Sequence, residues 1–197
     1  MKHLKIIFSL LVVGLLFSSI SVFAQEKGHK MSPEEKAWME YMTPGKMHEH
    51  FKSQVGDWTY VSKFWMNPES KKPMVTKGTS KAETIFGGRY LKMSHEGMMM
   101  GMPFKGFGLT GYDNAKKVYQ SIWIDNMGTG IMYMTGNMQD GKMVLTGSAP
   151  DPASGHDITM KDVTTIIDKD HFMFEMYVVT PKGDVKTMEI TYTRKIK

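Results

Sequence analysis

From Asp57 onward, apolar and polar side chains alternate in short runs that turn residues separate, the pattern of strands joined by hairpins. Asn67-Pro68, Gly87-Gly88 and Asp140-Gly141 are examples of these turns. The pattern predicts ten strands, at residues 57–66, 75–86, 89–99, 104–112, 118–125, 131–138, 142–148, 158–168, 171–180 and 185–195. Because no helix-length periodic segment interrupts them, we expect an antiparallel meander.

A meander of ten strands leaves two unpaired edges, and closing the sheet on itself removes both. We therefore predict an all-β fold, an antiparallel up-and-down β-barrel of about ten strands. A barrel of this size has room for more than its own side chains. The expected barrel domain spans residues 48–197, and we find no domain boundary after residue 57.

One or two short helices are expected before the barrel. Ser32-Pro33-Glu34-Glu35 is a strong helix start, because Ser32 and Glu35 can form a capping box and Pro33 suits the first helical position. This helix is expected to end near Met42, and a second is expected at residues 47–54. Residues 25–47 therefore form an N-terminal polar segment and helix.

Residues 1–24 have the layout of a secretory signal peptide. Lys2 and Lys5 precede an apolar run, and Val22 and Ala24 take the third and the last positions before a cleavage site. The apolar run is shorter than the roughly 20 residues that a membrane-spanning helix needs, so we favour cleavage over an uncleaved anchor. We expect an exported protein, periplasmic or secreted, with no membrane span in the mature chain.

The composition excludes several kinds of chemistry but does not decide what the methionines do. The chain holds no cysteine, which rules out disulfides, thiolate catalysis and iron–sulfur clusters. Its formal net charge is +5, but the lysines are scattered, so we expect no nucleic-acid partner. Its 21 methionines, some clustered at residues 98–102, admit three interpretations: core packing, a pliable apolar rim around a ligand, or a soft Cu(I) site. Because they are spread over nearly every strand, we favour core packing and predict no metal site and no cofactor.

Three further motifs have ordinary structural interpretations. Gly106-Phe107-Gly108-Leu109-Thr110-Gly111 matches a dinucleotide-binding pattern, but a strand follows it instead of a helix, so the glycines indicate bends or close backbone approach. His48-Glu49-His50 cannot chelate from one helix face, and we expect it on the surface. We interpret Asp125 and Asp162 as paired or solvent-facing, and nothing in the sequence gives positive support to an enzyme.

The segment Gln54-Val55-Gly56-Asp57-Trp58 places Gly-x-Trp where a short helix passes into the first strand, and Arg194 lies in the last strand. This arrangement resembles the calycin pattern of lipocalins and fatty-acid-binding proteins. The resemblance implies that Trp58 lies at the closed end of the barrel, with Arg194 packed across it. A guanidinium stacks well on an indole face, so the pair would tie the first strand to the last.

More specifically, the chain resembles an uncharacterised bacterial family, domain of unknown function 1579. The matching segments are residues 55–58, 87–90, 111–113, 123–125 and 192–195. The resemblance covers about residues 48–197. It implies a fold, but it carries no family activity or functional residue that can be transferred to this chain.

The period of two along each strand predicts which side chains face the barrel interior. The candidate ligand-binding residues are Trp58, Tyr60, Phe64, Leu91, Met93, His95, Trp123, Tyr192 and Arg194. Together they form a mixed aromatic, apolar and polar lining, which suits a small amphipathic or hydrophobic molecule. His95 is most simply a hydrogen-bonded core histidine, with contact to a ligand or to haem iron as the alternatives.

We therefore expect an exported, non-catalytic barrel that binds a small, partly apolar ligand. Two alternatives stay open at this point. One is a methionine-rich envelope protein that handles copper or haem, and the other is a structural or interaction module.

Overall fold

The computed structural model describes residues 30–66 and 72–196, so the predicted signal peptide lies outside the described residues. By its internal contacts the chain divides into two units, residues 1–40 and 41–197. Helix α3 (Pro33–Met42) begins with the capping box that the sequence predicts: the Ser32 backbone N–H donates to the Glu35 carboxylate at 2.7 Å, and the Glu35 N–H donates to Ser32 Oγ at 3.1 Å. No described helix is long and apolar enough to cross a membrane.

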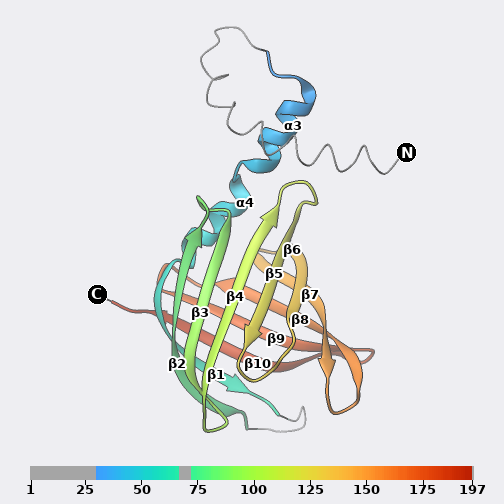
Figure 1. The fold of residues 1–197 in the computed structure, drawn as a ribbon. Coiled ribbons are helices and arrows are strands. Elements are labelled where there is room, and N and C mark those ends of the chain that lie inside the picture. The colour runs from blue at the N-terminus through green and yellow to red at the C-terminus, as the bar shows by residue number, and fades with distance from the viewer. Residues whose placement is uncertain (1–29, 67–71, 197) are drawn as a thin grey trace. The chain divides into compact units, whose positions relative to one another are not determined.

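The second unit contains ten antiparallel strands that close into a barrel (Figure 1). The strands are β1 (Gly56–Phe64), β2 (Met74–Ile85), β3 (Tyr90–Met99), β4 (Met102–Asp113), β5 (Val118–Asp125), β6 (Met132–Gln139), β7 (Lys142–Asp151), β8 (His156–Ile166), β9 (His171–Thr180) and β10 (Gly183–Arg194). Each strand pairs with the next along the chain, and β1 pairs with β10. The predicted up-and-down barrel is therefore confirmed.

Tight turns keep successive strands adjacent. Asp140 and Gly141, between β6 and β7, both have positive φ, at 49° and 78°. Met100 and Gly101, between β3 and β4, have φ of 53° and 78°. Two-residue turns with both central residues at positive φ match the right-handed twist of hairpin strands. The Asp-Gly pair suits this geometry well, because glycine enters the left-handed region without steric cost.

The barrel closes along a seam between β1 and β10. Trp58 is paired with Arg194 at one end of this seam, and Phe64 with Met188 at the other. Because the period of two is kept along both strands, Tyr60 faces the same side as Trp58. The seam leaves neither the first nor the last strand with an unpaired edge.

Two short helical segments, α4 (Lys46–Glu49) and η1 (His50–Ser53), lie at the end of the barrel where β1 begins (Figure 1). From η1, the Phe51 ring packs edge-on against Tyr119 of β5, with ring centroids 6.0 Å apart, and both side chains are fully buried. The Tyr119 hydroxyl donates to the Met47 carbonyl at 2.8 Å. These contacts close that end of the barrel.

The expectation that His48 lies on the surface is wrong. His48 is buried, and its Nδ1 accepts a hydrogen bond from the Gly45 backbone N–H at 3.0 Å. Its ring packs edge-on against Phe51 and Tyr112. Burial lowers the pKa of His48, so the imidazole acts as a neutral cap for the start of α4.

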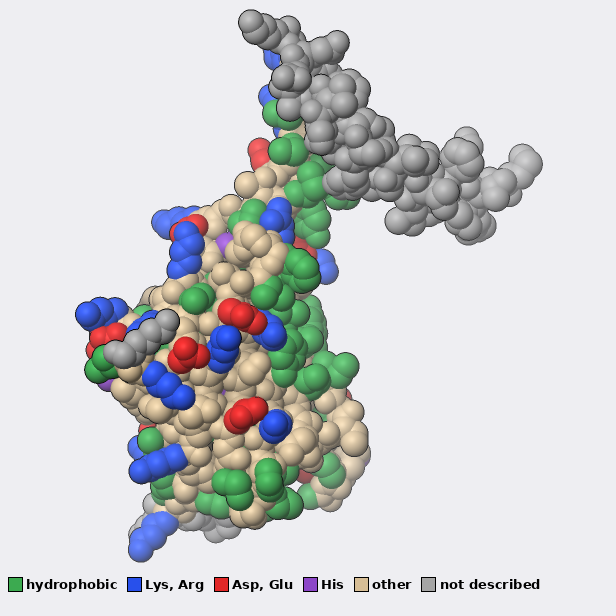
Figure 2. Space-filling model, turned by 60° about the vertical axis from the view of Figure 1, so that its left-hand side comes forward, with side chains coloured by type: hydrophobic (Ala, Val, Ile, Leu, Met, Phe, Trp, Pro, Cys, Tyr) green, Lys and Arg blue, Asp and Glu red, His purple; other side chains and the backbone are tan. Residues whose placement is uncertain are grey.

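The outer wall of the barrel carries basic and acidic side chains close to one another (Figure 2). Lys63 and Glu189 lie directly opposite each other on β1 and β10 and form an ion pair at 2.8 Å. Lys92 and Glu83 do the same on β3 and β2 at 3.0 Å. Opposite charges at paired positions stabilise the ladder modestly and keep the outer surface hydrated.

Candidate ligand-binding cavity

A cavity of about 530 Å³ lies inside the barrel, and all ten strands contribute side chains to its wall. Its size falls within the range of about 300–1,000 Å³ that is usual for small-molecule sites. At the end away from α4 it reaches the β3–β4 turn at Met99 and the β5–β6 loop at Met127 and Ile131. The cavity is therefore closed by η1 at one end and bordered by apolar loop residues at the other.

The structure brings seven of the nine predicted site residues together in this wall. They are Tyr60, Phe64, Leu91, Met93, His95, Trp123 and Tyr192. The alternation of faces explains the agreement, because each strand has one inner face and one outer face. The other two, Trp58 and Arg194, are not part of the wall and lie at the closed end.

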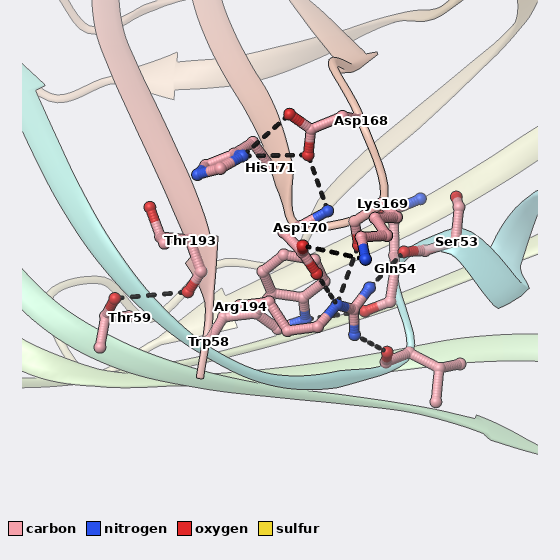
Figure 3. Close-up of polar contacts among 11 residues, drawn as sticks. Ser53, Gln54, Trp58, Thr59, Asp168, Lys169, Asp170, His171, Thr193 and Arg194 are labelled. Atoms are coloured by element: carbon pink, nitrogen blue, oxygen red, sulfur yellow. Dashed lines mark hydrogen bonds and ion pairs between the residues drawn. The ribbon is translucent and has the colours of Figure 1, made fainter. Parts of the chain in front are cut away.

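Trp58 and Arg194 form a clamp across the seam (Figure 3). Trp58 is only 1 % exposed, and the Arg194 guanidinium carbon lies 4.1 Å from the centre of its ring. The indole Nε1 donates to the Gln54 carbonyl at 2.8 Å, so the polar edge of the ring is also satisfied. The stacked arrangement implied by the calycin resemblance is present.

The guanidinium of Arg194 also holds the backbone around it. Nη1 donates to the Val55 carbonyl at 2.6 Å, and Nη2 donates to the Ser53 carbonyl at 3.0 Å. Nε donates to the Lys169 carbonyl at 2.9 Å (Figure 3). One side chain thereby joins the end of η1, the start of β1 and the β8–β9 loop. A Cβ at Gly56 would lie 2.4 Å from Nη1, so glycine is needed there to admit the guanidinium.

His95 lies at the centre of an aromatic cluster inside the barrel. Its Nε2 is 2.8 Å from the Tyr192 hydroxyl, and its ring lies 5.7 Å from Tyr60 and 5.2 Å from Trp123. Burial lowers the pKa of His95 to about 4, so the imidazole is neutral at physiological pH. Its Nδ1 has no hydrogen-bond partner among the described residues. His95 is therefore a core histidine with one nitrogen still available.

Trp123 forms part of the cavity wall because two glycines leave room for it. A Cβ at Gly106 would lie 2.3 Å from the Trp123 indole, and one at Gly108 would lie 3.3 Å from it. These glycines lie within strand β4 and permit close approach of the indole, as the sequence predicts. The indole Nε1 donates to the Asp125 carboxylate at 2.6 Å.

Asp162 on β8 is an acidic group in the wall that is absent from the predicted set of site residues. It lines the cavity, is only 9 % exposed, and has an Oδ1 atom without a hydrogen-bond partner among the described residues. Burial raises its pKa to about 8. The interpretation of this residue as paired or solvent-facing is therefore wrong, whereas Asp125 is paired as expected. The available signal was its spacing of two from Met160 and Thr164, which places all three on one strand face.

The methionines serve more than one purpose in the barrel. Met134 and Met160 belong to the buried core. Others line the cavity: Met93, Met98, Met99, Met127, Met132, Met143, Met176 and Met188. Flexible thioether side chains fill irregular space and adapt to a bound molecule. Among the described residues, no group of three His, Asp or Glu side chains is placed to hold a metal ion.

This architecture defines a calycin-like β-barrel with an internal cavity. A family model described as "Protein of unknown function (DUF1579)" matches residues 43–194, so the chain belongs to that family. No curated protein matches it.

Among solved structures, the S-type phycobiliprotein lyase CPES from Guillardia theta is similar in fold, with a TM-score of 0.50 and 14 % identity over 81 % of this chain and 97 % of the lyase. A redesigned beta barrel matches with a TM-score of 0.39 and 14 % identity, over 74 % of this chain and 95 % of that one. At this level of identity the similarity to the lyase concerns the fold alone.

Proposed function

We propose that this protein is an exported, non-catalytic barrel that binds a small, partly apolar molecule in its interior. The observation that carries the proposal is the cavity of about 530 Å³ inside the closed barrel. Small-molecule sites combine mostly apolar walls with a few polar groups that fix orientation. Here the aromatic and methionine side chains supply the apolar wall, while His95 and Asp162 supply polar groups.

The wall explains why an apolar molecule would enter. Transfer of apolar surface from water into such a cavity is favourable at roughly 25 cal/mol per Å². The methionines near the Met99 and Met127 loops can rearrange around molecules of different shape. The closed end, by contrast, is fixed by the Trp58–Arg194 clamp, so ligands would enter at the opposite end.

Binding can be tested with N-phenyl-1-naphthylamine, an apolar probe whose fluorescence rises in a dry site. Ser62 on β1 is buried and lines the cavity, whereas its neighbour Val61 is exposed on the outer face. Ser62→Phe should fill part of the cavity and weaken probe binding by about tenfold, since close packing leaves little room for both groups. Val61→Phe adds the same ring outside and should leave binding unchanged. Absence of binding to the wild type, or equal binding to both variants, would contradict the proposal.

Export is tested separately. We expect that expression of the full chain in a Gram-negative bacterium yields a periplasmic product whose N-terminal residue is Gln25, since cleavage after Ala24 fits the small-residue rule. A cytoplasmic product that keeps Met1 would contradict this part of the proposal.

A further inference from the structure

The cavity wall carries acidic side chains and, apart from His95, no basic one among the residues that the structure describes. The wall contains two carboxylic acids, Asp125 and Asp162, and among the residues that the structure describes it contains no lysine or arginine. His95 is neutral because burial lowers its pKa to about 4. The interior is thus acidic, although the chain as a whole carries a formal net charge of +5.

The two acids differ in how their oxygens are satisfied. Asp125 accepts hydrogen bonds from Trp123 Nε1 at 2.6 Å, from the Met127 N–H at 2.8 Å and from the Gly128 N–H at 3.1 Å. The Oδ1 atom of Asp162 is buried without a partner among the described residues. Buried polar atoms are nearly always hydrogen-bonded in folded proteins, and an unpaired one is costly. Of the two acids, Asp162 is therefore the one that lacks a donor.

Two further wall residues carry buried atoms without a partner in the described structure: His95 at Nδ1 and Gln54 at Nε2. Both, like Asp162, lie in a wall whose remaining surface is mostly aromatic or methionine. A purely hydrocarbon ligand would leave all three polar atoms unsatisfied. The cavity is better matched by a molecule with a polar, hydrogen-bonding group attached to an apolar body.

We propose that this cavity selects amphipathic amines: the ammonium group donates to the carboxylate of Asp162, which releases its own proton to solvent when the amine binds, and the apolar part lies against the methionine and aromatic wall. The inference rests on the proposed binding function and names the class of ligand. A charge-assisted hydrogen bond is among the stronger polar contacts in proteins. A fatty acid would instead bring a carboxylate next to two acids, with no lysine or arginine of the described wall to pair with it.

Three ligands of equal chain length separate the effect of charge on binding from the effect of apolar burial. They are decylamine, decanol and decanoic acid. Each is titrated at neutral pH against bound N-phenyl-1-naphthylamine on the wild type, Asp162→Asn and Asp125→Asn. On the wild type, decylamine should bind about tenfold or more tightly than decanoic acid, the scale of one hydrogen bond to a charged group. Asp162→Asn should remove most of that preference and leave decanol binding unchanged, while Asp125→Asn should keep most of it.

The outcomes separate the two proposals. Probe and decanol binding without any preference for decylamine would overturn the amine inference and leave the binding function intact. No binding of the probe or of any of the three ligands would overturn both. Loss of the amine preference in Asp125→Asn, with its retention in Asp162→Asn, would overturn the role given to Asp162. If Asp162→Asn does not fold, the ranking of the three ligands on the wild type still decides for or against amine selection.

Discussion

Replacing Asp162 by Asn should change how the stability of the barrel depends on pH. Asp162 is only 9 % exposed, and burial raises the pKa of its carboxyl to about 8 from the usual 3.8. Asn has nearly the same shape as the protonated acid and does not titrate in this range. The substitution therefore removes one ionisation and leaves the volume of the cavity wall almost unchanged.

The sign and size of the effect follow from proton linkage. Between pH 3.8 and about 8, folded Asp162 keeps a proton that the unfolded chain has lost, so stability falls by about 1.4 kcal/mol per pH unit. His95 acts in the opposite sense between about 4 and 6.5, because the unfolded chain binds a proton that the buried imidazole does not. The two contributions oppose each other up to pH 6.5. Above pH 6.5 Asp162 acts alone, and the expected loss between pH 6.5 and 8 is about 2 kcal/mol.

Urea unfolding of the ligand-free protein, followed by tryptophan fluorescence at several pH values from 6.5 to 8, measures this loss. The wild type should lose about 2 kcal/mol of unfolding free energy across the range, and Asp162→Asn should lose much less. Asp125→Asn is the matched control and should keep the slope of the wild type, because Asp125 is already hydrogen-bonded. Equal slopes for the wild type and Asp162→Asn would refute the reasoning.

Three further predictions concern packing and hydrogen bonding. Trp58→Ala should cost about 3–5 kcal/mol in urea unfolding, as for other large buried aromatic residues, and an unchanged midpoint would mean that the clamp does not hold the seam. Gly136→Ala should lower the free energy of unfolding by about 1–3 kcal/mol, because the added Cβ would lie 2.0 Å from a carbonyl oxygen. Gly128→Ala is the control: a Cβ there meets open space, so the same assay should show almost no change. Tyr192→Phe should lower the thermal midpoint, since His95 Nε2 loses its partner at a cost of about 1–3 kcal/mol; an unaltered midpoint would contradict that bond.

The alternation of inner and outer side chains was the most informative feature of the sequence. Tyr60 and Phe64 on β1, and Leu91 and His95 on β3, line the cavity as predicted. The reason is geometric: a strand with one buried face must place alternate residues on it, so one correct assignment fixes the others. Barrel closure was predictable for a related reason, because ten meandering strands otherwise leave two edges open.

The interpretations of His48 and Asp162 failed for a different reason. Each residue looks ordinary among its sequence neighbours, and its burial depends on elements far away in the chain. Tyr112 of β4 covers His48, while Leu145 of β7 and Met176 of β9 flank Asp162 in the sheet. Local patterning reports which face of a strand is inward, but it does not report which polar groups on that face find a hydrogen-bond donor.

The seam between β1 and β10 has a consequence for how the protein reaches its native state. The partner of β1 is β10, the tenth strand of the meander, so a nascent chain holds β1 with one edge unpaired until β10 has been synthesised. Such long-range pairing slows folding, and the exposed edge invites aggregation in the meantime. The barrel should therefore depend on a chaperone that holds the unfolded chain until all ten strands can pair, and a chain that stops short of Arg194 should be degraded.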